Sequence, residues 1–303
     1  MKDTIKVVVT GGAGFIGSHL VHALVKKGYE VEVVDNLRAG DQKRLPVGVK
    51  LHKIDIRDAD KLKVVFKGAK FVFHTAALPR VQPSIKDPVT TNDVNVNGTL
   101  GVLVAAKDAE VKRVIYSSSS SVYGNQKKLP LRENMEPRPL SPYGLQKYIG
   151  ELHCRLFSQV YGLETVCLRY FNVYGPNAPV DGVYALVIGK FCDQRKHGKP
   201  LTIVPDGKQS RDFTHVSDIV RANILAAHSS KVGKGEAINA GGGRNRTVLE
   251  VAKLIGGPSV FIEPRMEAKH SLADIKKAKK LLGWKPNITL EQGIEELKKY
   301  YDL

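Results

Sequence analysis

The sequence predicts an α/β fold in which a doubly wound parallel sheet is followed by a smaller, mixed region. Two observations carry this prediction. Short β-rich runs alternate with longer helical patterns up to about residue 170, as is typical of parallel βαβ units joined by right-handed crossovers. The first of these runs ends in a glycine-rich turn that leads directly into a helical pattern.

The elements of the first part follow in order. Strands are predicted at residues 5–10, 30–34, 50–54, 70–74, 113–117 and 164–170, of which 50–54 has the weakest pattern. Helices are predicted at residues 14–27, 59–66 and 142–161, and in a long stretch that begins after Pro88. We therefore expect residues 1–170 to form one sheet-containing domain.

The pattern changes after about residue 172, where glycine and proline become denser. Helical patterns at residues 217–228, 247–255 and 290–301 are separated there by loops. We expect residues 171–303 to form a smaller, mixed C-terminal domain. The pattern leaves open a return of the chain to the first domain near residues 212–240.

The charge balance is strongly basic. The 303 residues include 47 Lys and Arg against 30 Asp and Glu, which gives a net charge of +17. A surface of this sign favours anionic partners such as phosphorylated small molecules. Nucleic acid is not an expected partner, because the lysines are spread along the chain and no zinc-finger spacing or RNP-like motif accompanies them.

The sequence does not predict a membrane segment, a disulfide framework or a metal site. No apolar run approaches the roughly 18 residues that a bilayer span needs. Cys154, Cys167 and Cys192 are an odd number without a C-x-x-C pair, and His19 and His22 share a helix face without a third ligand. We therefore expect a cytoplasmic protein without a metal.

The glycine turn predicts a dinucleotide site. Gly11 permits the tight turn, Gly14 lets a pyrophosphate approach the backbone, and Gly17 lets the helix pack near the strand. Asp35 lies eighteen residues after Gly17, where a carboxylate binds an adenosine ribose and repels a 2′-phosphate. The pattern favours NAD, although Arg38 nearby leaves NADP open. The alternative is a glycine turn without a ligand.

A tyrosine and a lysine four residues apart predict an acid–base pair. Tyr143 and Lys147 share one face of the helix predicted at 142–161. A free phenol titrates near ~10, and an ammonium beside it stabilises the phenolate. The strand at 113–117 leads into five serines, residues 117–121, at the edge where parallel sheets bind ligands. The alternatives are a solvated helix face and a solvated serine loop.

Together these motifs resemble the extended short-chain dehydrogenase/reductases, in the group of NAD-dependent sugar epimerases and dehydratases, and most closely the UDP-glucose 4-epimerases. The resemblance runs nearly from end to end and includes segments 10–17, 35–36, 55–56, 74–78, 117–124, 143–147, 169–176, 211–218 and 273–284. It implies a Rossmann-type fold with a substrate-binding C-terminal domain, tightly bound NAD and a UDP-sugar substrate. It also implies a homodimer in which the helices around 90–107 and 142–160 pack together.

The resemblance assigns roles to individual residues. Tyr143 would be the catalytic base, Lys147 its partner and Ser119 the catalytic hydroxyl. Cofactor contacts are implied for Gly11, Gly14, Phe15, Ile16, Gly17, Asp35, Asn36, Leu37, Arg38, Ala39, Gly40, Asp55, Ile56, Ala76, Ala77, Leu78, Tyr143, Lys147 and Tyr170. Substrate contacts are implied for Ser119, Tyr143, Asn172, Arg211 and Arg265, the arginines mainly through the diphosphate.

The residues before the V-Y-G motif at 122–124 bear on the reaction. Dehydratases of the resembled group carry an acidic pair there and decarboxylases a glutamate, whereas this chain has Ser120 and Ser121. We therefore expect inversion at C4 of a UDP-hexose by transient oxidation with NAD. UDP-glucuronate 4-epimerase, dehydratase and reductase activities stay open as alternatives. A non-catalytic NAD-binding regulator is a further alternative, against which the intact catalytic set argues.

Two departures from the resembled family concern the substrate. Members read R-x-G-D/E near Arg265, whereas this chain reads R-M-E-A-K-H at 265–270, one residue short. Ser271 stands two positions before Ala273, where some members carry a bulky residue. A small residue there leaves room for an N-acetyl group. We therefore expect turnover of UDP-GlcNAc and UDP-GalNAc as well as UDP-glucose and UDP-galactose.

Overall fold

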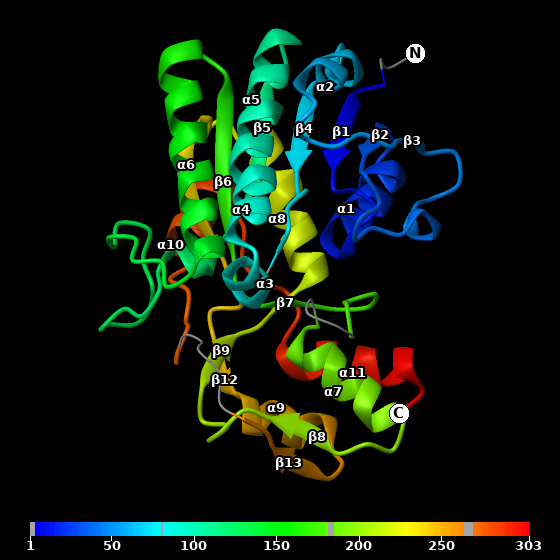
Figure 1. Cartoon of the computed structure of the whole chain (residues 1–303), viewed down its shortest axis with the longest axis vertical. Helices are drawn as coiled ribbons and strands as arrows, with labels where there is room; N and C mark the ends of the chain where they lie inside the picture. The colour runs from blue at the N-terminus through cyan, green and yellow to red at the C-terminus, as the bar shows by residue number, and fades with distance from the viewer. Residues whose placement is uncertain (1–3, 80, 181–184, 264–268) are drawn as a thin grey trace.

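A parallel sheet in the strand order β11-β6-β5-β4-β1-β2-β3 is the largest element of the protein (Figure 1). The computed structural model describes residues 4–79, 81–180, 185–263 and 269–303. Within them the sheet has seven strands, all paired in parallel. They are β1 (Lys6–Thr10), β2 (Glu30–Val34), β3 (Lys50–His52), β4 (Phe71–His74), β5 (Arg113–Ser119), β6 (Glu164–Tyr170) and β11 (Lys234–Ala240). The predicted doubly wound α/β fold is confirmed.

Helices cover both faces of this sheet. Successive side chains of each strand point to opposite faces, and those on both faces are apolar and need cover. Val7 and Val9 of β1 pack on the face covered by α1 (Phe15–Lys26), α8 (Val216–His228) and α10 (Lys276–Leu282). Val8 packs on the opposite face, which is covered by α2 (Ala59–Phe66), α5 (Gly98–Asp108) and α6 (Pro142–Tyr161). A parallel strand buried on both faces has no polar side to show, which explains the continuous apolar run in β1.

The long helical stretch predicted after Pro88 consists of three segments. They are α4 (Pro88–Asn92), a π-helical stretch (Asp93–Asn97) and α5, preceded by the short helix α3 (Val81–Lys86). The strand predicted at 50–54 is shorter than expected and ends at His52. Its composition, K-L-H, offers little apolar surface, so pairing with β2 alone keeps it in the sheet.

β11 is a strand that the sequence pattern does not predict. Its residues, K-G-E-A-I-N-A, have weak strand propensity, and it lies at the sheet edge, where it pairs with β6 alone. Residues 234–240 thus join the large sheet, and α8 packs on it. The division of the chain into domains at residue 170 stays a prediction.

The C-terminal elements gather below the carboxyl ends of the sheet strands, toward which the arrowheads of β1 and β4 point (Figure 1). Most of them contribute to one core of buried apolar side chains. The helices are α7 (Val187–Lys196), α9 (Val248–Ile255) and α11 (Leu290–Tyr301). The strand pairs are β7 (Val173–Tyr174) with β10 (Thr214–His215), β9 (Ser210–Asp212) with β12 (Asn245–Thr247), and β8 (Leu201–Ile203) with β13 (Ser259–Phe261). No described helix is long and apolar enough to span a bilayer.

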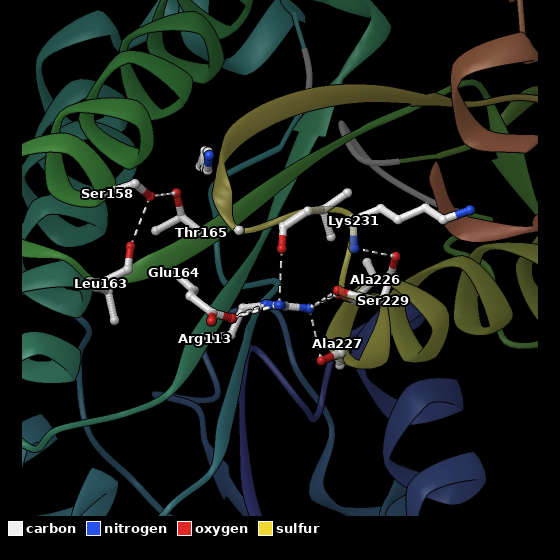
Figure 2. A network of polar contacts seen from close by, with 12 residues as sticks. Arg113, Ser158, Leu163, Glu164, Thr165, Ala226, Ala227, Ser229 and Lys231 are labelled. Carbon is white, nitrogen blue, oxygen red and sulfur yellow. Dashed lines mark hydrogen bonds and ion pairs between the residues drawn. The ribbon is translucent and has the colours of Figure 1, made fainter. Parts of the chain in front are cut away.

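The opposite, amino-terminal edge of the sheet is held by Arg113 at the start of β5 (Figure 2). Its guanidinium pairs with Glu164 at 2.5 Å and is almost fully buried. It donates hydrogen bonds of 2.7–3.0 Å to the carbonyl oxygens of Ala226, Ala227, Ser229 and Val232. These acceptors include the last carbonyls of α8, which have no partner within the helix. One cation therefore stabilises the end of α8 and fixes it against β5.

His74 at the end of β4 is neutral and buried. One ring nitrogen lies 2.7 Å from Thr10 Oγ1 and the other lies 3.0 Å from Thr99 Oγ1. Burial lowers the pKa of His74 to about 3, and the charge of Lys147 acts in the same direction. The folded protein therefore binds fewer protons than the unfolded chain between about pH 3 and the ordinary histidine pKa of 6.5.

We expect His74 to make the protein acid-sensitive. Its contribution is fully present above pH 6.5 and is lost as the pH falls, because the unfolded chain gains a proton that the folded state excludes. Between pH 7.5 and 5.0 this loss amounts to about 2 kcal/mol of unfolding free energy. Urea unfolding of wild type and His74→Asn at both pH values measures it. An equal acid-induced loss in the two proteins contradicts the prediction.

Candidate functional site

The glycine turn lies at the carboxyl end of β1, where the strand order reverses between β2 and β4. Gly11 has a φ of +71°, and a Cβ there would lie 2.6 Å from the backbone of Ala76. A Cβ on Gly17 would lie 2.1 Å from the Gly11 carbonyl oxygen. α1 begins after Gly14 without a side-chain cap and without an acidic residue in its first turn. The uncapped N–H groups and the helix dipole fit a pyrophosphate.

The Asp35 carboxylate ties this turn to the loop after β2. One of its oxygens accepts the Ala13 N–H at 3.1 Å and the other accepts the Leu37 N–H at 2.8 Å. Burial raises the pKa of Asp35, and the two backbone hydrogen bonds oppose that rise. A Cβ on Gly40 would lie 2.9 Å from both carboxylate oxygens, so the loop passes close to them. The carboxylate thus lies beside the glycine turn, where the sequence predicts the ribose.

The loops after β2 and β3 meet at Asp55. Asn36 donates to the Asp55 carboxylate at 3.0 Å, and Arg57 donates to both of its oxygens at 2.9 Å. The hydrogen bonds from Arg57 hold the pKa of Asp55 at about 2. Ile56 is buried against Gly98. An open hollow of about 700 Å³ beside the ion pair is lined by Asp55, Arg57, Asp58, Ala59, Asp60 and Asp93.

Asn95 holds the segment that follows β4. Its side-chain oxygen accepts the Leu78 N–H at 2.8 Å, and its amide nitrogen donates to the Leu78 carbonyl at 3.0 Å. The same nitrogen donates to Gln146 of α6 at 2.8 Å. Sequence reasoning missed both amides. The available signal was a polar side chain on the inward face of each helical pattern, a pattern that is also common in ordinary cores.

The other residues predicted to contact the cofactor lie in or next to the glycine turn and the loops after β2 and β4. Phe15 and Ile16 are half-buried beside the sheet core, and Ala77 is half-buried after β4. Arg38 and Ala39 are exposed in the loop after β2. Among the described residues, no group of three or more His, Cys, Asp or Glu side chains could hold a metal ion.

Lys147 and Tyr143 lie one turn apart on α6, against the end of β5. The Lys147 ammonium donates to the Ser117 carbonyl at 2.7 Å and is buried. It lies 6.0 Å from the ring centroid of Tyr143 and 4.9 Å from that of Tyr116. Burial lowers the pKa of Lys147 to about 8, so the amine stays mostly protonated at neutral pH. A cation in this position favours a phenolate.

Ser119 ends β5, which runs two residues further than predicted. Its hydroxyl oxygen accepts the Ser121 N–H at 3.1 Å and so caps a short 3₁₀ turn. A Cβ on Gly144 would lie 2.6 Å from the Ser121 carbonyl oxygen. Gly144 therefore lets the first turn of α6, which carries Tyr143, approach the strand end that carries Ser119. Sequence reasoning missed this role, although the glycine inside Y-x-x-x-K was its signal.

Tyr170 is the last residue of β6 and lies beside the group formed by Tyr143, Lys147 and Ser119. Its hydroxyl lies 2.9 Å from Ser117 Oγ and bonds to the side chain of Asn223 at 2.8–2.9 Å. Burial raises the pKa of Tyr170 to about 12, so its phenol stays neutral beside the proposed catalytic group. Phe171 is fully buried among Tyr123 and its apolar neighbours.

Residues far apart in the sequence meet below β6. Asn172 donates to the Asp212 carbonyl at 3.2 Å and to Ser271 Oγ at 3.3 Å. Arg211 donates to two backbone carbonyls at 3.0 Å. The structure thus brings Asn172, Arg211 and Ser271 together. Arg265, the other predicted substrate arginine, lies outside the described residues.

The Asp212 carboxylate fixes this region and was not singled out from the sequence. It is fully buried and accepts backbone N–H groups of Gly242, Gly243 and Ala273 at 2.6–3.0 Å. Burial raises its pKa to about 7, against the effect of these three hydrogen bonds. One side chain of β9 therefore joins the loop at Gly242 and Gly243 to the segment at Ala273 in the predicted substrate region.

Known proteins resemble this chain over nearly its whole length. Residues 7–241 match the sequence model of the NAD dependent epimerase/dehydratase family. A putative UDP-glucose 4-epimerase of Methanocaldococcus jannaschii is 39% identical over 300 residues, 96% of each chain. A Thermotoga maritima UDP-glucose 4-epimerase, solved with UDP-glucose, superimposes with a TM-score of 0.94 at 37% sequence identity. The similarity covers 98% of this chain and 99% of that chain.

A UDP-N-acetylglucosamine 4-epimerase of Methanobrevibacter ruminantium M1, solved with UDP-N-acetylmuramic acid, has a TM-score of 0.93 and 39% identity. The similarity covers 100% of this chain and 99% of that one. These matches confirm the resemblance that the sequence motifs indicate. The chain belongs to the NAD-dependent epimerase/dehydratase family and is an epimerase-like enzyme whose cofactor is NAD.

Proposed function

We propose that the protein inverts C4 of a UDP-hexose, with Tyr143 as general base, Lys147 as its charge partner and Ser119 as the polarising hydroxyl. The observation that carries the proposal is the buried Lys147 ammonium one helical turn from Tyr143, with 6.0 Å between nitrogen and ring centroid. Bound NAD supplies a reversible hydride acceptor, and a cycle that ends where it began needs no net oxidant.

The chain's own residues account for the proton transfer. The Tyr143 phenolate, stabilised by Lys147, takes the proton of the sugar 4-hydroxyl, and Ser119 donates a hydrogen bond to the same oxygen. When hydride returns to the other face of C4, the phenol gives the proton back. The sugar has to turn between these steps, so the site has to hold the diphosphate firmly and the hexose loosely.

Arginine and amide groups fit the diphosphate end of the substrate. Arg211 precedes Asp212, whose carbonyl accepts from Asn172, and a guanidinium binds phosphate oxygens in a bidentate manner. We assign Arg265 to the same task by family resemblance. The net charge of +17 assists the approach of an anionic substrate.

The strand end favours epimerisation over elimination. Ser120 and Ser121, next to Ser119, carry no carboxyl group that could take a proton from C5 during loss of water. The same absence argues against decarboxylase chemistry, for which the resembled enzymes have a glutamate. UDP-glucuronate stays an alternative epimerisation substrate.

We also propose that two copies associate through α6. Four apolar side chains at helical spacing, Leu145, Leu152, Leu156 and Val160, are 41–62% exposed. Such a stripe is typical of helix–helix interfaces.

The three cysteines are buried and free, which supports a reducing compartment such as the cytoplasm.

Replacing Tyr143 by Phe tests the mechanism. We expect kcat for UDP-glucose/UDP-galactose interconversion to fall by about 10²–10⁴-fold or more, because the proton acceptor is lost. NAD released from the denatured variant should equal that of wild type. Tyr161→Phe, at the far end of α6, is the matched control and should keep full activity. A Tyr143→Phe variant with near-wild-type activity overturns the proposal.

Substrate breadth depends on Ser271. We expect the wild type to interconvert UDP-GlcNAc and UDP-GalNAc as well as the unacetylated pair, with products resolved by NMR. Ser271→Tyr should lower kcat/KM for the N-acetyl pair by at least about tenfold more than for the plain pair, since a filled pocket excludes the extra group. Ser271→Ala, which keeps the space, should retain both activities. Absence of N-acetyl turnover in the wild type refutes this assignment.

Association through α6 predicts a mass change. Sedimentation of the wild type should give twice the chain mass, and Leu156→Glu should give the monomer, because a buried charge at the interface is costly. Val64→Glu is the control, since Val64 is exposed on α2, away from the stripe. A monomeric wild type, or a dimeric Leu156→Glu protein, rules out this interface.

A further inference from the structure

The first turn of α6 has one backbone donor that its own helix does not satisfy. The N–H groups at the start of a helix have no acceptor four residues back. Pro142 has no N–H, and Gly144 donates to the N-cap side chain of Ser141 at 3.2 Å. The N–H of Tyr143, between them, donates to Ser84 Oγ at 3.0 Å. The backbone of the proposed base is therefore held by a side chain 59 positions earlier.

Ser84 lies in α3 and is fully buried. Its hydroxyl donates to the Val81 carbonyl at 2.7 Å, which fixes the direction of the proton. A lone pair of the same Ser84 oxygen then accepts the Tyr143 N–H. Both hydrogen-bonding roles of the hydroxyl are thus used, and no apolar side chain of similar size provides either.

A second connection, about one turn later, joins α6 to α4 and to the π-helical stretch that follows it. Gln146 of α6 donates to Thr91 Oγ1 at 3.0 Å and accepts from Asn95 at 2.8 Å. Asn95 in turn holds both backbone groups of Leu78, in the segment predicted to line the cofactor cleft. Ser84 therefore fixes the first turn of α6 to α3, and Gln146 fixes the next turn through Asn95 to the segment predicted to line that cleft.

We propose that Ser84 is a positioning residue for catalysis. By holding the Tyr143 backbone, it sets the place of the phenol relative to the Lys147 ammonium and the Ser119 hydroxyl. Ser84 touches neither reacting group itself and acts through the first turn of α6. This inference rests on the proposed role of Tyr143.

Replacing Ser84 by Ala tests it. We expect kcat to fall about tenfold, which corresponds to the roughly 1.4 kcal/mol scale of one lost buried hydrogen bond. KM for the UDP-sugar and the NAD content should stay within about twofold of wild type, since no binding group is removed. The acid limb of the kcat–pH profile should move to higher pH, because a displaced phenol gains less from Lys147.

Two further variants separate positioning from stability. Ser84→Cys keeps the side-chain size with a weaker acceptor, and it should show the same split between kcat and KM even if Ser84→Ala fails to fold. Ser158→Ala is the matched control. Ser158 Oγ lies near the other end of α6 and bonds to the Leu163 carbonyl and Thr165 Oγ1, both at 2.8 Å (Figure 2). Its loss should lower the melting temperature and leave kcat and the pH profile unchanged.

The outcomes distinguish this inference from the proposed function. If Tyr143→Phe is inactive while folded Ser84→Ala and Ser84→Cys keep wild-type kcat and pH profile, the positioning role of Ser84 is wrong. If Tyr143→Phe stays active, the proposed function fails first, whatever the Ser84 variants do. A pH shift in Ser158→Ala equal to that in Ser84→Cys also overturns the inference, since the effect would then be general to α6.

Discussion

Lys147 carries a positive charge into the interior of the protein, and the packing of β5 against α6 has to satisfy it. An unpaired ammonium in a protein interior costs several kcal/mol. Here the nitrogen donates to the Ser117 carbonyl at 2.7 Å and lies 4.9 Å from the ring of Tyr116, whose face attracts cations. One turn further along α6, Glu151 is buried and pairs with Arg169 at 2.6 Å. The negative charge of Glu151 favours the charged form of Lys147.

This arrangement constrains how closely the helix and the strand approach each other. Two glycines on the face of α6 that meets β5 allow the contact. A Cβ on Gly150 would lie 2.2 Å from the Tyr116 hydroxyl, and one on Gly144 would lie 2.6 Å from the Ser121 carbonyl oxygen. The backbone of α6 therefore lies close to the Tyr116 side chain of β5 and to the turn that follows β5. The same closeness brings Tyr143, Lys147 and Ser119 to one edge of the sheet.

The C-terminal region faces this edge from below (Figure 1). Asn172 follows β6, Arg211 lies in β9 and Ser271 precedes the contact of Ala273 with Asp212. These segments meet at Asp212, whose backbone carbonyl accepts from Asn172 and whose carboxylate accepts from Gly242, Gly243 and Ala273. In the function we propose, this arrangement holds the diphosphate on one side and leaves the sugar room to turn.

Elements with strong local signals could be predicted from the amino-acid sequence alone. The apolar runs of β1 and β4, the glycine turn at Gly11 and the spacing of Tyr143 and Lys147 depend on short-range periodicity and backbone geometry, so they could be predicted without the fold. The tertiary structure decided the rest. β11 is a strand because β6 offers an edge, and Ser84 meets Tyr143 because α3 packs on α6. Asp212 of β9 joins two further segments, at Gly242–Gly243 and at Ala273, that no spacing relates to it. Contacts of this kind follow from the packing of distant segments, and a single sequence carries no local pattern that records them.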